Sequence, residues 1–231
     1  MAQQSPQAFW LENLDRAGAY IDWVFEETRP FLGRSILEVG CGTGTYTALL
    51  GGLGARVVAM DLEDDFVRTA RSAVAAFPRV EVRQGDATAQ QWEQGFDTVV
   101  MLDVLEHLGD DRTMLRRLAE TLEPGGRIVL KVPAFSWLHG TLDDAVGHFR
   151  RYERAGLSTL LLDSGFVRPK AWYFNAAAVP GWWLNGKLLR RTTPPASQLR
   201  LMDRLVPIMR AVDRVTRPIG GLSLFAVAER A

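Results

Sequence analysis

The chain has little cysteine and no long apolar run, and each shortage excludes a class of protein. Cys41 is the only cysteine among 231 residues, so no internal disulfide can form and a reducing compartment is expected. The longest apolar stretch, 171–184, is broken by Asn175 and Pro180 and falls short of the ~20 residues that span a bilayer. Residues 1–6 lack the basic start of a signal peptide. We therefore expect a cytoplasmic protein.

An excess of charge is also missing. The 27 lysines and arginines are balanced by 27 acidic residues, so the formal net charge is zero. Proteins that hold a nucleic-acid backbone usually carry a positive excess, and we therefore expect no nucleic-acid partner. Hydrophobic residues make up 47% of the chain, which is typical of a globular protein with a substantial core. The length suits one domain with additions.

Up to residue 132, short β-branched segments alternate with longer amphipathic ones. The segments expected to be strands are 35–39, 55–60, 80–83, 96–102 and 127–132. The segments expected to be helices are 46–53, 64–77 and 110–121, and 123–126 is expected to be a turn. Strand and helix in alternation predict an α/β fold with a doubly wound, mostly parallel sheet.

The ends of the chain depart from this alternation. Apolar residues at helical spacing predict one N-terminal helix over 7–28. After residue 133 we expect a loop with a helix start at 134–154, then a helix (157–164), a strand (167–174), helices (180–220) and a last strand (223–229). Residues 175–220 then form a C-terminal helical insertion between the last two strands. We predict a single domain, 1–231, with an N-terminal helical segment (1–30), a core (31–135) and a substrate-side segment with a helical cap (136–231).

A glycine-rich segment stands where the first strand meets the next helix. Gly40, Gly42 and Gly44 follow Glu38 at alternate positions. So tight a turn needs backbone angles open to glycine, and it lets a ligand approach the main chain. The spacing differs from the dinucleotide-binding pattern, because Thr45 occupies the place of its last glycine. The glycines could also serve the turn alone.

Acidic residues follow the next three strands. Asp61 ends the second strand, Asp86 follows the third and Asp103 follows the fourth. The carboxyl ends of parallel strands share one edge of the sheet, where ligands bind. Asp61 can accept hydrogen bonds from both hydroxyls of a ribose, and Asp86 can accept one from an adenine amino group. Two alternatives stay open, in which Asp61 caps the next helix and Asp86 only makes a turn.

Together these features resemble a known family. The segments that carry the resemblance are 38–44, Asp61, Gly85-Asp86, 103–108 and 122–126. They resemble the class I S-adenosylmethionine-dependent methyltransferases of small molecules, and are similar to the group of ubiquinone and menaquinone biosynthesis. The resemblance covers about residues 30–135. It implies a seven-stranded sheet with the last strand antiparallel, S-adenosylmethionine as cofactor and a small-molecule acceptor.

The resemblance also implies which residues bind the cofactor. Glu38 and the glycines would shape the methionine pocket, Asp61 would hold the ribose, and Asp86 with Ala87 would meet the adenine. We expect Cys41 to pack as a small residue and not to act as a nucleophile. The full predicted set is Glu38, Gly40, Cys41, Gly42, Gly44, Tyr46, Asp61, Leu62, Gly85, Asp86, Ala87, Leu102, Asp103, Val104 and His107.

Histidine is the side chain best suited to serve as general base near neutral pH, and only three are present. We predict that His148, in the segment after the fifth strand, acts as base or substrate ligand, with His107 as second choice. A capping or salt-bridging role for His148, and a structural role for His107, are the alternatives. The predicted substrate contacts are Arg151, Tyr152, Trp137 and Trp182.

We expect no metal ion, although the resemblance leaves one alternative. Asp103, Glu106 and His107 could ligate a divalent metal, as in some quinone-biosynthesis methyltransferases that this segment resembles. The residues between them are apolar, which argues against it.

The paired tryptophans Trp182-Trp183 precede a basic turn, and an apolar stripe continues from Leu199 to Met209. One interpretation is a helical cap that packs on the core, or on a second subunit of a homodimer. Another is a lid, or a peripheral contact with a membrane or lipid through Trp182-Trp183.

The function predicted from these features is O-methylation of a small hydrophobic, lipid-linked or sugar-linked metabolite by direct in-line transfer. N- or C-methylation of a small molecule is the alternative within the same class. A cofactor-binding partner protein without turnover is the alternative from another class. Methylation of RNA or protein is disfavoured, because the charge is neutral and no Asn-Pro-Pro-Tyr-type segment follows the fourth strand.

Overall fold

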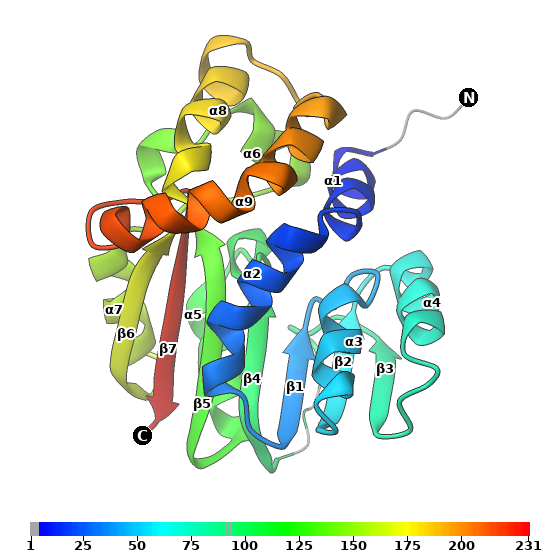
Figure 1. Cartoon of the computed structure of the whole chain (residues 1–231). Helices are drawn as coiled ribbons and strands as arrows, with labels where there is room; N and C mark the ends of the chain where they lie inside the picture. Colours follow the sequence, from blue (N-terminus) through cyan, green and yellow to red (C-terminus); the bar gives the residue numbers. More distant parts are fainter. Residues whose placement is uncertain (1–4, 91, 93) are drawn as a thin grey trace.

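A computed structural model describes residues 5–90, 92 and 94–231. Its centre is a seven-stranded sheet in the order β3-β2-β1-β4-β5-β7-β6 (Figure 1). The strands are β1 (Ser35–Val39), β2 (Arg56–Asp61), β3 (Val80–Gln84), β4 (Phe96–Leu102), β5 (Leu122–Pro133), β6 (Phe166–Phe174) and β7 (Ser223–Arg230). The pairs among β1 to β5 are parallel, whereas β7 pairs antiparallel with both β5 and β6. The predicted fold class is confirmed.

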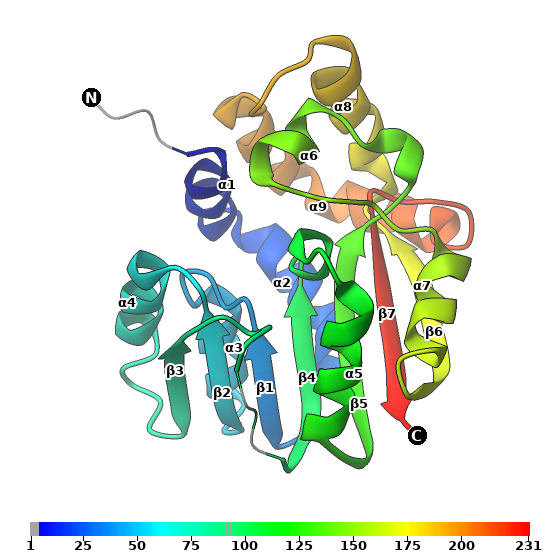
Figure 2. The same cartoon turned by 180° about the vertical axis from the view of Figure 1, so that it is seen from behind.

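Helices cover both faces of the sheet, which explains why its central strands are almost continuously apolar. On one face lie α2 (Gly18–Thr28), α3 (Thr45–Gly52) and α4 (Asp64–Ala73); on the other lie α5 (Asp111–Thr121) and α7 (Arg154–Leu162) (Figure 2). Leu37, Val99 and Leu130, in the middle of β1, β4 and β5, are completely buried. Strands buried on both faces favour such runs.

The prediction of a single N-terminal helix over 7–28 is wrong. The segment forms α1 (Pro6–Asp15) and α2, because Ala17 leaves the helical region with φ −95° and ψ 66°. The break lets α1 turn toward the loop after β1, where Leu11 lies next to Gly42. The periodicity of apolar residues could not reveal this break, because it runs on through both helices.

The expected turn at 123–126 lies inside the limits of β5. Phe96 of β4 pairs with Leu122, and the next pair is Thr98 with Arg127, so the four residues between Leu122 and Arg127 have no partner on β4. Gly125 has φ 77°, a left-handed conformation that glycine adopts readily. The segment is therefore an irregular excursion within a strand.

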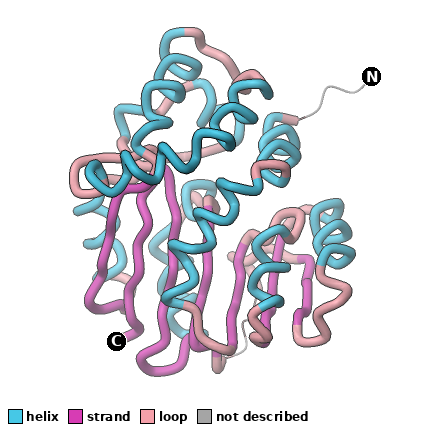
Figure 3. The backbone as a smooth tube through the Cα atoms, in the orientation of Figure 1, coloured by secondary structure: helices cyan, strands magenta, loops and turns pink. Residues whose placement is uncertain are grey.

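A helical cap lies over the carboxyl ends of β5 and β6 and the amino end of β7, which lies between them (Figure 3). Its first part is a 3-10 turn (Ser136–Leu138) and α6 (Thr141–Val146). Its second part lies between β6 and β7, as expected, and contains a 3-10 turn (Ala176–Ala178), α8 (Val179–Trp183), a π-helical turn (Leu184–Leu188) and α9 (Ala196–Thr216). No described helix combines the length and the apolar character needed to cross a membrane.

Candidate active site

The loop between β1 and α3 is built on three glycines in the left-handed conformation. Gly40, Gly42 and Gly44 have φ values of 77°, 53° and 88°. A Cβ atom on Gly40 would lie 2.2 Å from Val104 Cγ2, and one on Gly44 would lie 2.7 Å from the Cα atom of Ala70. Any larger residue there would both strain the backbone and collide with its neighbour. The sequence therefore folds into a bare main-chain corner at the ligand-binding edge of the sheet.

Two carboxylates hold this corner. Glu38 is buried near the end of β1, and its Oε2 accepts a hydrogen bond from the Thr47 hydroxyl at 2.6 Å. Burial raises the pKa of Glu38 to about 7. Asp61 ends β2 and accepts from the backbone N–H of Gly42 at 2.8 Å and of Glu63 at 3.1 Å. Each carboxylate oxygen has a second lone pair, so Asp61 can still accept from a ligand.

The segments after β2 and β3 form an exposed flank of the same corner. Leu62 is 61% exposed although it is large and apolar. Asp86 is exposed and accepts from the Thr88 hydroxyl at 2.7 Å and from the Thr88 N–H at 2.8 Å, and these hydrogen bonds lower the pKa of Asp86. Asp86 thus has the turn-making role considered as its alternative, and a contact with adenine stays a prediction.

A buried lysine lies beside the acid that follows β4. Lys131 of β5 forms an ion pair with Asp103, whose own backbone is left-handed with φ 56°. The Lys131 ammonium also lies 5.9 Å from the ring centre of Tyr20, within reach of a cation–π contact. Burial lowers the pKa of Lys131, but Asp103, together with the other acidic groups nearby, raises it by more. The lysine is therefore charged at neutral pH. Tyr46, next to Tyr20, is partly buried, and its pKa is raised well above the usual range, mainly by desolvation.

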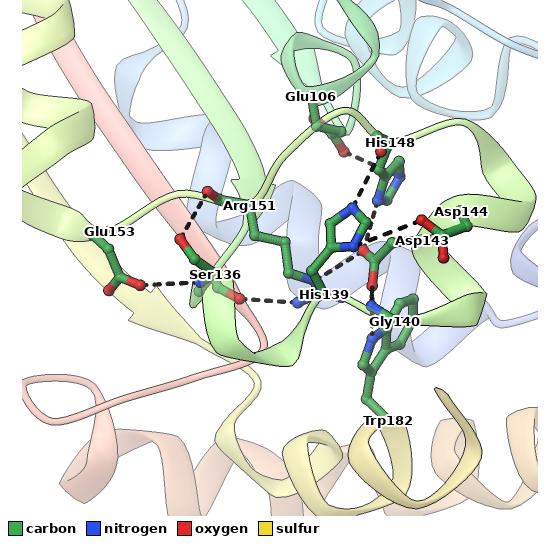
Figure 4. Close-up of polar contacts among 11 residues, drawn as sticks. Glu106, Ser136, His139, Gly140, Asp143, Asp144, His148, Arg151, Glu153 and Trp182 are labelled. Atoms are coloured by element: carbon green, nitrogen blue, oxygen red, sulfur yellow. Dashed lines mark hydrogen bonds and ion pairs between the residues drawn. The ribbon is translucent and has the colours of Figure 1, made fainter. Parts of the chain in front are cut away.

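Beyond this pair, the structure brings His148 together with His107, which lies in another segment. The two rings meet edge to face with centres 4.7 Å apart. His148 Nδ1 lies 2.9 Å from Asp143 Oδ1, and its Nε2 lies 3.7 Å from Glu106 Oε1 (Figure 4). A carboxylate only accepts hydrogen bonds, so we assign the proton to Nδ1. In the neutral ring the Nε2 lone pair is then free.

The groups around His148 Nε2 are uncharged at neutral pH. Glu106 is fully buried and neither of its carboxyl oxygens has a hydrogen-bond partner. Burial, and then the charge of Asp103, raise the pKa of Glu106 well above its usual range. Burial, and then His148, lower the pKa of His107 to about 4. His148 therefore lies beside a protonated acid and a neutral imidazole.

Asp143 at the start of α6 fixes His148 from the other side. It is completely buried and accepts from Arg151 Nε at 2.8 Å, the Gly140 N–H at 3.0 Å and Trp182 Nε1 at 3.4 Å, in addition to His148 (Figure 4). Burial raises the pKa of Asp143, but its contacts with His148 and Arg151 lower it by more, so the net shift is downward. The result is an ionised carboxylate that locks the ring of His148 in place.

Two of the predicted substrate contacts have partners within the protein. Arg151 is buried, and besides Asp143 it donates to the carbonyl oxygen of Ala134 at 2.9 Å. The hydroxyl of Tyr152 donates to Asp111 Oδ2 at 3.0 Å. Both side chains therefore help to hold the segment against β5 and α5, and a contact with substrate stays a prediction for each.

The predicted tryptophan contacts differ in exposure. Trp182 stacks on Trp10 of α1 with ring centres 5.7 Å apart and lies 4.7 Å from the Arg151 guanidinium. Its indole thus packs into the protein, and of the pair Trp182-Trp183 only Trp183, 44% exposed, lies mainly at the surface. Trp137 is 55% exposed and lies against Phe135 at the end of β5.

Glu106, His107 and His148 could also ligate one metal ion. Each offers one ligand atom, and these atoms lie within 4.8 Å of one another. A carboxylate and two imidazoles suit several divalent transition metals. In the alternative raised from the sequence, Asp103 stood in place of His148; in the structure Asp103 pairs with Lys131. The expectation that the site uses no metal stays a prediction.

Comparisons with known proteins agree with this geometry. Residues 37–128 match a family model described as a methyltransferase domain. The chain is 35% identical over 111 residues to the mitochondrial ubiquinone biosynthesis O-methyltransferase of Schizosaccharomyces pombe, covering 46% of this chain and 40% of that protein. It is 32% identical over 137 residues to a probable S-adenosylmethionine-dependent methyltransferase of Mycobacterium tuberculosis, covering 58% and 49%. The chain thus spans about half the length of these relatives.

Solved structures share the fold over nearly the whole chain. A methyltransferase from Archaeoglobus fulgidus superposes with a TM-score of 0.65 at 17% identity, covering 96% of this chain and 99% of that one. A possible histamine N-methyltransferase from Thermotoga maritima gives 0.64 at 15% identity, covering 96% and 93%. At such low identity the likeness shows the fold alone.

The chain carries a class I methyltransferase domain. The residues present fit S-adenosylmethionine, the compound that the name of the Mycobacterium tuberculosis relative gives. The corner requires glycine at position 40, because a Cβ atom there would collide with Val104. Asp61 keeps acceptor capacity at the end of β2, and Leu62 offers exposed apolar surface beside it. The contacts of individual residues with the cofactor stay predictions.

Three residues of the methyltransferase site were missed in the sequence. Lys131 gave a signal, because it is the one charged residue inside an apolar strand segment, Ile128 to Val132. Tyr20 lies among apolar residues of a helix, and Asp143 lies in a polar stretch next to a second aspartate. Nothing local distinguishes these two residues, since their partners come from distant segments.

Proposed function

We propose that this methyltransferase methylates a hydroxyl oxygen of a small hydrophobic, lipid-linked or sugar-linked metabolite, with His148 as general base. One observation carries the proposal: a buried, ionised Asp143 holds His148 Nδ1 at 2.9 Å, while no described residue makes a hydrogen bond to Nε2. An imidazole oriented by a carboxylate is suited to accept a proton from a hydroxyl.

S-adenosylmethionine supplies an electrophilic methyl group on a sulfonium, and Glu38, Gly40, Asp61 and Tyr46 are the residues we propose to hold it. The protein's own task is to orient the acceptor and remove its proton. His148 Nε2 takes the hydroxyl proton as the oxygen bonds to the methyl carbon and the carbon–sulfur bond breaks. Asp143 then stabilises the imidazolium, because its negative charge lies against Nδ1.

The uncharged neighbours favour a neutral acceptor. Glu106 is protonated and His107 is neutral at physiological pH, so they add no charge beside the base. Aromatic side chains of Phe135 and Trp137 lie near the same edge. Such surroundings favour an apolar acceptor with few polar groups. The named activity of the yeast relative, ubiquinone biosynthesis O-methylation, supports a quinone-type hydroxyl.

C-methylation is a second candidate with its own support. The chain is 37% identical over 112 residues to the demethylmenaquinone methyltransferase of Clavibacter sepedonicus, covering 47% of this chain and 46% of that one. Transfer to carbon would also need a base for the ring proton. The two candidates differ in the product, since a methyl ether and a ring methyl group have different NMR shifts.

The test is methyl transfer from radiolabelled S-adenosylmethionine to an alkylated catechol, an alkylated hydroquinone and a glycolipid extract. We expect His148→Ala to lower kcat by 10²–10⁴-fold, the usual contribution of a general base. Asp143→Asn should lower kcat less, because the base keeps its position but loses the negative charge that stabilises its protonated form. Affinity for S-adenosylmethionine, measured by calorimetry, should stay unchanged in both.

The matched control is Asp144→Asn, which alters the adjacent exposed carboxylate and should leave kcat unchanged. Asp61→Ala should lose cofactor binding. Unchanged turnover in His148→Ala would refute the role of the base, and cofactor binding without transfer to any acceptor would support a partner protein without turnover. Loss of activity on treatment with a chelator, restored by a divalent metal, would favour the metal cluster of Glu106, His107 and His148.

A further inference from the structure

The outer face of α9 carries a continuous apolar stripe that no described residue covers. Its members are alternately four and three residues apart and therefore share one side of the helix and of the turn after it. They are Leu201, Leu205, Ile208, Val212, Val215 and Ile219, with exposures from 39% to 77%. The inner face packs through Val206 and Met209 against α2 and the ends of β6 and β7. The helix is thus anchored on one side and bare on the other (Figure 1).

The surface beside the stripe is basic. Arg200, Arg204 and Arg214 are exposed along α9, and Lys187 and Arg190 are exposed in the segment before it. None of these five lies within ion-pair distance of a carboxylate among the residues that the structure describes. The positive charges are therefore available to an outside partner.

The acidic residues of the same segment point inward. Residues 183–219 contain eight lysines and arginines but only two aspartates, in a chain whose overall charges balance. Asp213 is buried and accepts from the backbone N–H groups of Asn175 and Ala176 at 3.0 and 2.9 Å. Asp203 accepts from the N–H of Tyr20 at 3.0 Å. Neither aspartate is thus exposed, and both carboxylates already accept hydrogen bonds from the protein's own backbone.

We propose that this face docks on an anionic lipid surface. An apolar helical stripe bordered by arginines is the pattern of helices that lie in the interface of a membrane, with the apolar side among the acyl chains and the cations at the headgroups. A second copy of the chain fits less well. Two-fold pairing through α9 would bring the arginines of each copy near those of the other, and like charges in an interface are unfavourable.

Further exposed apolar residues lie in the part of the cap that precedes α9. Leu184, Leu188 and Leu189 are 42%, 62% and 47% exposed, and Trp183 precedes them. The cap lies at the same edge of the sheet as the carboxyl ends of β4 and β5, which lead into the segments of Asp103 and His148 (Figure 3). Docking through α9 would therefore bring the site end of the molecule close to the lipid, where an apolar acceptor would concentrate. This inference concerns binding and does not depend on the identity of the base or of the acceptor.

The test is co-sedimentation of the full chain with vesicles, without cofactor or acceptor. Vesicles of phosphatidylcholine alone are compared with vesicles containing about one third phosphatidylglycerol, at low salt and at high salt. We expect binding to the anionic vesicles only, weakened by salt. Leu205→Gln/Ile208→Gln should abolish it, and Arg204→Gln/Arg214→Gln should weaken it roughly 30-fold, at about a factor of five for each cation.

The matched control is Arg34→Gln/Arg79→Gln, which removes two exposed arginines from the opposite end of the sheet and should bind like the unaltered chain. All variants alter exposed side chains, and thermal unfolding would verify that they fold. No binding to anionic vesicles, or equal binding by the α9 variants and the control, would overturn the proposal. A dimer seen by light scattering that Ile208→Gln abolishes would also overturn it, in favour of a second copy.

Discussion

Buried carboxyl groups of this methyltransferase differ in whether they are ionised, and their surroundings decide the outcome for each one. Glu38 and Glu106 are both enclosed, and in both the pKa is raised mainly by burial. Asp143 is enclosed as well, yet it stays ionised because His148 and Arg151 compensate its charge. The same side-chain chemistry thus yields an acid that titrates near neutral pH at Glu38, a protonated acid at Glu106 and a fixed anion at Asp143.

Replacing Glu38 should change how stability depends on pH. The pKa of Glu38 is raised from 4.5 to about 7 in the folded protein, so the folded state keeps a proton that the unfolded state loses. Its contribution is present below pH 4.5 and is lost as the pH rises through 7. We expect the unaltered protein to lose roughly 3 kcal/mol relative to Glu38→Gln between pH 4.5 and 8.

Urea unfolding of both proteins across that pH range measures the difference. The glutamine keeps an oxygen that can accept from Thr47, so the hydrogen bond at 2.6 Å is not lost by the substitution itself. Parallel stability curves for the two proteins would contradict the raised pKa.

The sequence revealed residues whose role depends on position at a strand end. Asp61 ends β2 and Asp103 follows β4, and the sharing of one edge by the carboxyl ends of parallel strands was enough to predict that both lie at this edge. Asp143 could not be found in this way, because its partners Arg151, His148 and Trp182 lie in loops and helices of the cap. Loop geometry depends on tertiary contacts, which local sequence does not determine.

At the scale of elements, the corner between β1 and α3 depends on its contact with the segment after β4. Gly40 faces Val104, and Gly44 faces Ala70 of α4. The corner is therefore clamped between two other elements, and its shape is part of the packing of the domain. Stability and cofactor binding should respond together when this packing is disturbed.

Two glycines with the same backbone conformation separate conformational strain from steric collision. Gly40 and Gly54 have φ values of 77° and 76°, but only at Gly40 would a Cβ atom meet a neighbour, Val104, at 2.2 Å. We expect Gly54→Ala to cost about 1 kcal/mol of unfolding free energy, from the backbone alone. Gly40→Ala should cost clearly more and should also weaken binding of S-adenosylmethionine.

Denaturant unfolding and calorimetry measure the two effects. Adding Val104→Ala to the Gly40→Ala protein removes the Cγ2 atom and should restore part of the lost stability. Equal costs at Gly40 and Gly54 would show that the collision relaxes freely.

The elements predicted best were those with a strong local pattern. The strands of the parallel core were located to within a few residues, because burial on both faces makes them apolar and β-branched. The irregular segment at 123–126 was located by its glycines, although β5 starts before it, at Leu122. The break between α1 and α2 was missed, because it arises where α1 meets the glycine corner and does not interrupt the local pattern.

At the scale of the whole molecule, the cap and the core differ in charge as well as in structure. The cap segment 183–219 holds eight basic and two acidic residues, although the chain as a whole is neutral. The zero net charge of the whole chain does not reveal this local excess of positive charge. The prediction of a helical insertion was correct, whereas the direction in which its stripe faces became visible only with α9 in place.

Uneven charge gives an electrically neutral molecule a permanent dipole. At pH 7, close to the isoelectric point of about 6.9, the protein should hardly migrate in an electric field. The same protein should nonetheless be retained on a sulfonated column and released by salt, because a dipole turns its positive end toward a negative surface before contact. If α9 is the part that contacts the column, Arg204→Gln/Arg214→Gln should elute at lower salt than the unaltered chain.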